Sequence, residues 1–244
     1  MIIISGSSWA VGEWAEQAVS HPGLAQYIID DRKSVINLSQ PGTSSLVFYQ
    51  VLDNFMRFNK QHIVEKIIVF ENNYLHYYSD LLNHNAETAK IFTEKLSDGI
   101  DHFISFLSSH FYHQLSTLGQ QYNVPIVLVG SYTDTLWLEK FSIEYPMVSI
   151  GCQSTVNLVV TGDSKISTPV RIVHLSATNI PTIEIIKKNL SRIEIEKFLD
   201  YIDLGQKRNH IFKKHPEYFY PDGCHLNRKS HKILFNYLKE HSFL

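Results

Sequence analysis

The first nine residues constrain the fold of this chain more than any other segment. Ile2-Ile-Ile4 is an uninterrupted β-branched run, which is typical of a strand buried on both faces of a parallel sheet. Ser5-Gly-Ser-Ser8 then ends the run, because its glycine permits a sharp turn and its serines are small. A helix is predicted from Trp9 onward, so Ser8 lies where a buried strand gives way to a helix. In open α/β sheets, ligands bind at such carboxyl ends of strands.

A serine at position 8 has two interpretations. Its hydroxyl is a candidate nucleophile, and the backbone N–H groups around it are candidate donors to an oxyanion. Turns of the strand–Gly–Ser–helix kind also bind phosphate or only cap a helix. The segment lacks the spacing and the lysine of a phosphate-binding P-loop. From these residues alone, the catalytic serine and the structural cap stay equally open.

The rest of the chain alternates between predicted strands and helices. Apolar runs predict strands over 34–38, 66–70, 124–130 and 145–150. Helical spacing predicts a helix over 9–28, which ends near the Pro22-Gly23 break or restarts after it. Further helices are predicted over 46–59, 86–121 and 227–241, with one or two more over 182–212. Such alternation is typical of a parallel sheet covered by helices on both faces.

One segment interrupts this alternation. The runs Val156–Val160 and Val170–Leu175 flank a Thr-Gly-Asp-Ser turn, which predicts a hairpin or a loop-rich insertion at 152–180. We find no internal repeat and no linker elsewhere. The sequence therefore predicts a single domain over 1–244 that carries an insertion at 152–180.

The composition excludes several classes of function. The net charge is −2 and no basic stripe is present, so no nucleic-acid partner is expected. No apolar run approaches the roughly 20 residues that cross a bilayer, and no signal peptide is visible, so a cytoplasmic location is expected. Cys152 and Cys224 form no metal motif or disulfide framework and are expected to be reduced thiols. His110 and His113 are better explained as a half-exposed helix surface than as metal ligands.

A second candidate for chemistry lies just before the last predicted helix. Asp222 and His225 are three residues apart within Tyr220–Asn227, on a tight turn that Pro221 and Gly223 help to shape. At this spacing the carboxylate can hold one imidazole nitrogen and leave the other free as a base, which a serine nucleophile needs. The alternative is that Asp222 caps the last helix and His225 packs on it.

Taken together, these segments resemble the SGNH (GDSL-like) hydrolase family of esterases and lipases. Gly6-Ser-Ser8 is similar to the family's Gly-Asp-Ser block and places Ser8 on the nucleophile. Asn37–Gly42 resembles the second block, whose glycine N–H contributes to the oxyanion hole. Glu71-Asn-Asn73 falls where the third block supplies an asparagine side chain to the same hole. Asp222-Gly-Cys-His225 is similar to the final Asp-x-x-His block, and the resemblance spans the whole chain in the right order.

The resemblance implies a three-layer α/β/α domain with a parallel sheet of about five strands in flavodoxin-like order. It also implies a serine esterase that hydrolyses a carboxylic ester through an acyl-serine intermediate. In that reaction Ser8 attacks, His225 takes its proton and Asp222 orients His225. The Ser8 and Gly42 N–H groups and the Asn73 side chain stabilise the oxyanion. No metal or cofactor is implied.

Two departures from the family pattern leave questions open. Ser7 replaces the aspartate that usually braces the site, and either Asn72 or Asn73 is the asparagine that faces the oxyanion. An acyltransferase of the same fold and a non-catalytic binding or structural module that retains the fold remain alternatives. The substrate class stays open between an acetylated glycan, a lipid and a small acyl ester, and 152–180 is expected to shape that choice. The sequence leaves the oligomeric state undetermined.

Overall fold

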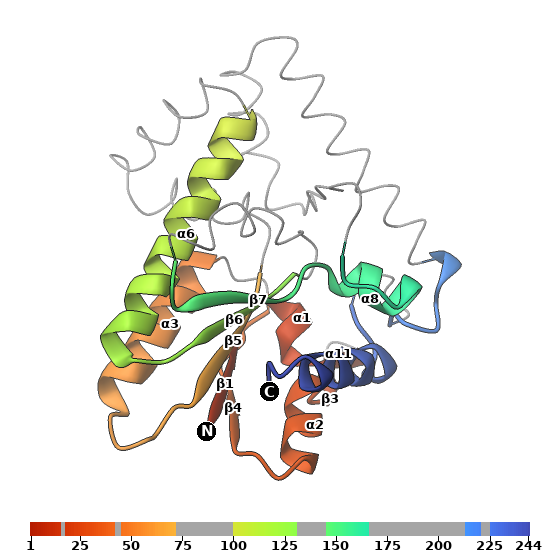
Figure 1. Ribbon diagram of the computed structural model, residues 1–244. Helices are drawn as coiled ribbons and strands as arrows, with labels where there is room; N and C mark the ends of the chain where they lie inside the picture. Colours follow the sequence, from red (N-terminus) through yellow and green to blue (C-terminus); the bar gives the residue numbers. More distant parts are fainter. Residues whose placement is uncertain (16–17, 42–44, 72–99, 131–144, 166–212, 221–224) are drawn as a thin grey trace.

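A five-stranded parallel sheet forms the centre of the molecule (Figure 1). The computed structural model describes residues 1–15, 18–41, 45–71, 100–130, 145–165, 213–220 and 225–244. The strands of the sheet are β1 (Ile2–Ser5), β4 (Val35–Asn37), β5 (Lys66–Phe70), β6 (Ile126–Val129) and β7 (Val148–Cys152). They lie in the order β4-β1-β5-β6-β7, and every neighbouring pair is parallel. Counted along the chain, this is the 2-1-3-4-5 order of a flavodoxin-like sheet, as predicted.

Strand β1 is buried on both faces, as its isoleucine run predicted. Ile2 and Ile4 belong to one hydrophobic cluster, whereas Ile3 belongs to the other, and all three are at most 3% exposed. Alternate side chains of a strand point to opposite faces, so β1 contributes to the core on each side of the sheet. Burial on both faces is typical of a central strand in a doubly covered parallel sheet.

Helices cover the two faces of the sheet and complete three layers. On one side lie α2 (Leu24–Asp30), α8 (Thr155–Thr161) and α11 (Arg228–Glu240), and on the other lie α3 (Ser45–Phe58) and α6 (Ile100–Tyr122) (Figure 1). Helix α11 has the bounds that the sequence predicted within one residue, because the Asn227 side chain accepts the Ser230 N–H and so caps its first turn. Helix α6 confirms the second half of the helix predicted over 86–121; residues 86–99 lie outside the described residues.

The first part of the helix predicted over 9–28 is wrong, whereas its restart after the Pro22-Gly23 break is confirmed by α2. The structure has a short α1 (Ser8–Val11), an antiparallel pair β2 (Glu13–Ala15) and β3 (Ala18–His21), and then α2. Gly12 ends α1 with a φ of 137°, which only glycine adopts easily. A Cβ at this position would lie 2.2 Å from the His21 carbonyl oxygen, so the pair closes directly on Gly12. Pro22, which lacks an N–H, then separates the pair from α2.

The extended run predicted over Val156–Val160 is also wrong, because these residues belong to α8. The Ser154 side chain accepts the Asn157 N–H at 3.1 Å and caps the helix, and Gly162 ends it in the left-handed conformation. These two caps stabilise the helix in spite of the preference of β-branched residues for strands. Residues 166–180 and 182–212 lie outside the described residues, so the insertion and the helices expected there stay predictions.

The two chain ends lie near the amino ends of the strands (Figure 1). The Met1 ammonium group contacts Glu65 Oε1 at 2.7 Å, just before β5. At the other end of the chain, the Phe243 carbonyl accepts a 2.7 Å hydrogen bond from Lys66 Nζ. None of the described helices is both long enough and apolar enough to cross a membrane.

Candidate active site

The order of the strands defines a switch point between β1 and β5. Strand β1 is followed along the chain by β4 on one side of the sheet, whereas β5 is followed by β6 on the other, so the order of the strands reverses between β1 and β5. Ser5 is in register with Val69, and the residues that follow both strands therefore emerge side by side. In sheets of this order, ligands bind in the crevice at such a point, outside the carboxyl ends of the strands.

Gly6 shapes the turn after β1. Its φ of 148° is rare for other residues, and a Cβ would lie 2.8 Å from Phe70 Cβ and 2.9 Å from the Phe70 carbonyl oxygen. The turn therefore passes directly against the end of β5, where a larger residue has no room. This close approach fixes where the following serines lie.

The two serines of this turn have different exposures. Ser7 is 4% exposed, its Oγ is inaccessible to solvent, and it makes no side-chain hydrogen bond to cap α1. Ser8 is the first residue of α1 and is half-buried, so a small ligand reaches Ser8 more easily than Ser7. Ser7 is at the N-cap position of α1, but its side chain makes no capping hydrogen bond, and Ser8 is already inside the helix. Neither serine side chain therefore caps α1.

Three hydrogen bonds attach the second predicted block to β1, to the turn after β1 and to α1. The Leu38 N–H donates to the Ile4 carbonyl at 2.8 Å, and the Gln40 N–H donates to the Gly6 carbonyl at 3.0 Å. The Asn37 side chain donates to the Ala10 carbonyl at 2.8 Å. The loop after β4 therefore lies against the turn that carries Ser8. Gly42 itself lies outside the described residues.

The third predicted block begins with a buried carboxylate. Glu71 has no exposed surface, its N–H donates to the Val129 carbonyl at 2.8 Å, and its Oε1 accepts a hydrogen bond from the Tyr112 hydroxyl. These contacts fix the chain at the point where it leaves β5, beside the turn after β1. Both Asn72 and Asn73 lie outside the described residues.

The fourth predicted block is partly described. His225 is half-buried, and its carbonyl accepts the Tyr220 N–H at 2.8 Å. The next residue, Leu226, forms an antiparallel bridge with Phe219, so the two sides of the turn predicted over 220–227 are paired. Asp222 and Cys224 lie outside the described residues, and the pairing of Asp222 with His225 stays a prediction.

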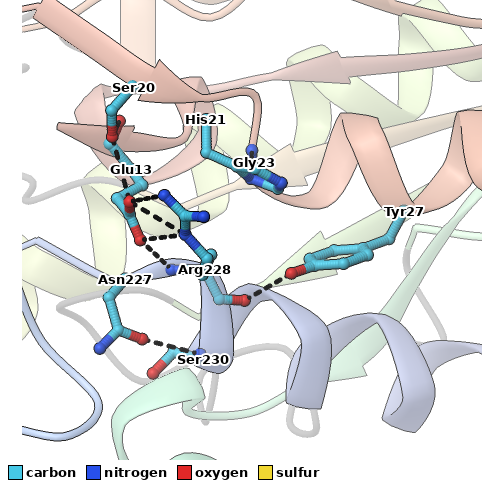
Figure 2. A network of polar contacts seen from close by, with 8 residues as sticks. All are labelled: Glu13, Ser20, His21, Gly23, Tyr27, Asn227, Arg228 and Ser230. Carbon is cyan, nitrogen blue, oxygen red and sulfur yellow. Dashed lines mark hydrogen bonds and ion pairs between the residues drawn. The ribbon is translucent and has the colours of Figure 1, made fainter.

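An ion pair joins the beginning of the chain to the beginning of α11 (Figure 2). Glu13 Oε2 accepts the backbone N–H of Arg228 at 2.6 Å, and Glu13 Oε1 accepts Arg228 Nη2 at 2.9 Å. The Ser20 hydroxyl donates to Oε1 at 3.1 Å. The hydrogen bond from the Arg228 side chain is the main reason why the pKa of Glu13 falls to about 2, against the opposing effect of burial.

This ion pair joins the segment that follows the first predicted block to the segment that follows the last one. Glu13 comes five residues after Ser8, and Arg228 comes three residues after His225. The sequence prediction missed both charged residues, because they are far apart in the chain and match no motif. No signal in the sequence singles out Glu13, because Glu16 is a second acidic residue in the same largely apolar segment.

The remaining chemical candidates do not form a second site. Cys152 is a free, fully buried cysteine, and burial raises the pKa of its thiol to about 12, so it is not a reactive thiolate. Within the part of the chain that the structure describes, no three His, Cys, Asp or Glu side chains are grouped so as to hold a metal ion. The ring of His113 lies edge-on to Tyr145, with 6.5 Å between the ring centroids.

Several solved structures are similar to this chain, and two of them illustrate the range. One is the lipase Lip_vut3 from a goat rumen metagenome, 14% identical, with a TM-score of 0.49 over 98% of this chain and 95% of that chain. The other is protein YXIM_BACsu from Bacillus subtilis, 10% identical, with a TM-score of 0.44 over 99% of this chain and 56% of that chain. No protein-family model and no curated protein matches the sequence. Similarities this low say nothing about what this chain does.

A buried histidine next to the ion pair makes stability depend on pH. His231 of α11 has no exposed surface, and a Cβ on Gly23 would lie 2.9 Å from its ring. Burial lowers the pKa of His231 to about 4; nearby His21 acts in the same direction, and the Gly12 backbone and Glu13 oppose it. In the unfolded chain a histidine titrates near 6.5.

We expect the free energy of unfolding to fall as the pH drops from about 6.5 to about 4, because only the unfolded chain takes up this proton there. The loss attributable to His231 is about 3 kcal/mol by pH 4. Urea unfolding of wild type and His231→Phe between pH 7.5 and 4.5 tests this, with the exposed His62→Gln as control. Equal pH dependence in His231→Phe and wild type would contradict it.

Proposed function

We propose that this chain is a serine esterase that hydrolyses a carboxylic ester through an acyl-serine intermediate. The observation that carries the proposal is the position of Ser8, which is half-buried and directly follows the turn at the switch point of the sheet. Its neighbour Ser7 is buried, so Ser8 is the better candidate nucleophile. The ion pair of Glu13 with Arg228 supports His225 as the base, because it joins the segments that carry the two residues.

In the proposed reaction, His225 takes the hydroxyl proton as Ser8 Oγ bonds to the ester carbonyl carbon. The tetrahedral intermediate then loses its alcohol, which leaves with the proton from His225. Water, deprotonated by the same histidine, attacks the acyl-serine, and the acid leaves while Ser8 regains its proton. Asp222 orients His225 throughout.

The oxyanion formed in each half of the reaction needs hydrogen-bond donors. We assign the Ser8 and Gly42 N–H groups and the Asn73 side chain to this role. The hydrogen bond between Gln40 and Gly6 supports Gly42, which follows Gln40 by two residues. The emergence of β5 beside β1 supports Asn73, which comes three residues after Phe70. Side-chain and backbone groups are sufficient for this chemistry.

A fluorophosphonate probe tests the proposal directly, because only an activated serine reacts with it. We expect stoichiometric labelling of wild type and recovery of the label on the peptide that contains Ser8. A panel of p-nitrophenyl esters from acetate to long-chain acyl groups then defines the acyl chain that the site accepts. An unlabelled, folded protein that hydrolyses none of these esters would contradict the proposal and favour a non-catalytic module.

The two asparagines after β5 are expected to differ. Asn73→Ala should lower turnover by about a hundred-fold or more, because an oxyanion donor acts mainly in the transition state. Asn72→Ala serves as the matched control and should cost far less. Steady-state kcat and KM on p-nitrophenyl acetate measure both effects. The opposite ranking would assign the oxyanion contact to Asn72.

A further inference from the structure

We propose that Glu13 and Arg228 are positioning residues. They hold the segment that contains His225 at a fixed position relative to the turn that carries Ser8. This inference rests on the proposed function and adds two residues to it. Neither is proposed to touch the substrate. Their role is to fix the distance between a nucleophile at one end of the chain and a base at the other.

Glu13 and Arg228, together called the junction below, are held by several hydrogen bonds (Figure 2). The Glu13 carboxylate receives the backbone N–H of Arg228, the guanidinium of the same residue and the hydroxyl of Ser20. Glu13 is only 7% exposed, whereas the Arg228 side chain is 60% exposed. A buried, hydrogen-bonded carboxylate holds its partner backbone far more firmly than a solvated surface pair does.

The junction lies close in sequence to both reacting groups. On one side, Gly12 alone separates Glu13 from α1, whose first residue is Ser8. On the other side, two residues separate Arg228 from His225, and one of them is the Asn227 cap of α11. Chain segments this short transmit a displacement of the junction to the residues beside it. A misplacement of about 1 Å at a reacting group costs on the order of a hundred-fold in rate.

The junction keeps its charge over the whole range in which a histidine acts as a base. Because the pKa of Glu13 is lowered to about 2, its carboxylate stays ionised at neutral and mildly acidic pH. The Tyr27 hydroxyl adds a further hydrogen bond, 3.0 Å long, to the Arg228 carbonyl. The start of α11 is thereby attached both to the β2–β3 pair and to α2.

The chain offers a matched control at the other end of the same helix. Lys239 forms an ion pair with Asp31, and this pair also attaches α11 to the segment after α2. It lies 14 residues beyond His225, at the end of α11 away from the proposed base. Loss of either ion pair weakens the docking of α11, but only loss of the Glu13–Arg228 pair should affect the reaction.

The experiment compares Glu13→Gln, Arg228→Gln, Arg228→Lys and Lys239→Gln with wild type on p-nitrophenyl acetate. We expect Glu13→Gln to lower kcat by about ten- to a hundred-fold with KM within about two-fold. Arg228→Gln should lower kcat less, because the backbone N–H contact stays, and Arg228→Lys should recover most of that loss. Lys239→Gln should keep kcat within about two-fold even where urea unfolding shows a lowered midpoint.

Two results would overturn the inference, and they differ from a failure of the proposed function. The first is that Glu13→Gln has the same kcat as Lys239→Gln while wild type shows Ser8-dependent hydrolysis. The second applies if Glu13→Gln does not fold. In that case the variants of the exposed Arg228 side chain are compared, and equal kcat values for Arg228→Gln and Arg228→Lys would overturn the inference. A wild type that reacts with neither fluorophosphonate nor esters refutes the proposed function itself, and the inference with it.

Discussion

Ser8→Ala is expected to abolish ester hydrolysis while leaving the protein folded. Removal of the nucleophile of a serine triad typically lowers turnover on the order of a million-fold, because no other group forms the acyl-enzyme. The substitution removes one oxygen from a half-buried side chain at the start of α1 and introduces a good helix former, so the fold is expected to stay. Turnover of p-nitrophenyl acetate and loss of fluorophosphonate labelling measure the effect, and circular dichroism checks the fold.

Ser7→Ala is the control for this prediction. The Ser7 hydroxyl is buried, whereas the Ser8 side chain is half-buried. Its loss is expected to change turnover by no more than about ten-fold, since oriented groups beside a site affect its geometry but not its chemistry. If Ser7→Ala lost activity and Ser8→Ala kept it, the nucleophile would have to be moved by one residue.

The second large effect is expected at the other end of the chain. His225→Ala should leave only the background rate that oxyanion and substrate contacts supply, a loss of about a million-fold. Asp222→Asn should cost about ten-thousand-fold even at high pH, because the amide holds the wrong imidazole tautomer.

A pH profile of kcat/KM for all three proteins measures these effects on one ester. Near-native rates in both variants would mean that the residues of the Asp-x-x-His block only shape the turn before α11. In that case the base would have to be sought among other residues near Ser8. The Lys239→Gln variant provides the reference for any loss that comes from weaker docking of α11 alone.

The central sheet was predictable because its signals are local. Ile2-Ile-Ile4 and Lys66–Phe70 are short, apolar and β-branched, and strands buried on both faces require such runs. The flavodoxin-like order, by contrast, followed from the resemblance and not from the runs themselves. Periodicity identifies a strand, but the neighbour of a strand is set by contacts between distant segments.

The two errors have the same physical origin. Residues 9–28 contain enough apolar side chains for a helix, but Gly12 ends α1 and the packing of His21 against it favours a strand pair. Val156–Val160 is β-branched, but the caps at Ser154 and Gly162 and burial against the sheet favour a helix. Intrinsic propensity is a small term, and capping and tertiary packing outweigh it.

The candidate site was partly predictable for a related reason. Its blocks are short motifs, and the structure places the described parts of the first three beside one another at the ends of β1, β4 and β5. The Glu13–Arg228 contact joins residues 215 positions apart, and no local pattern encodes such a pair. Glu13 and Glu16 are both acidic residues of one largely apolar segment, so the sequence does not show which of them has a partner or which residue that partner is.

The placement of the chain ends has a practical consequence for attaching this protein to a surface. Met1 and Phe243 are held near the amino ends of the strands, whereas Ser8 follows the carboxyl end of β1. A sensor chip or resin linked through Leu244 would therefore lie at the amino ends of the strands and leave the edge that carries Ser8 open to solution. A peptide fused before Met1 would instead replace the ammonium group that pairs with Glu65, which makes the carboxyl end the better point of immobilisation.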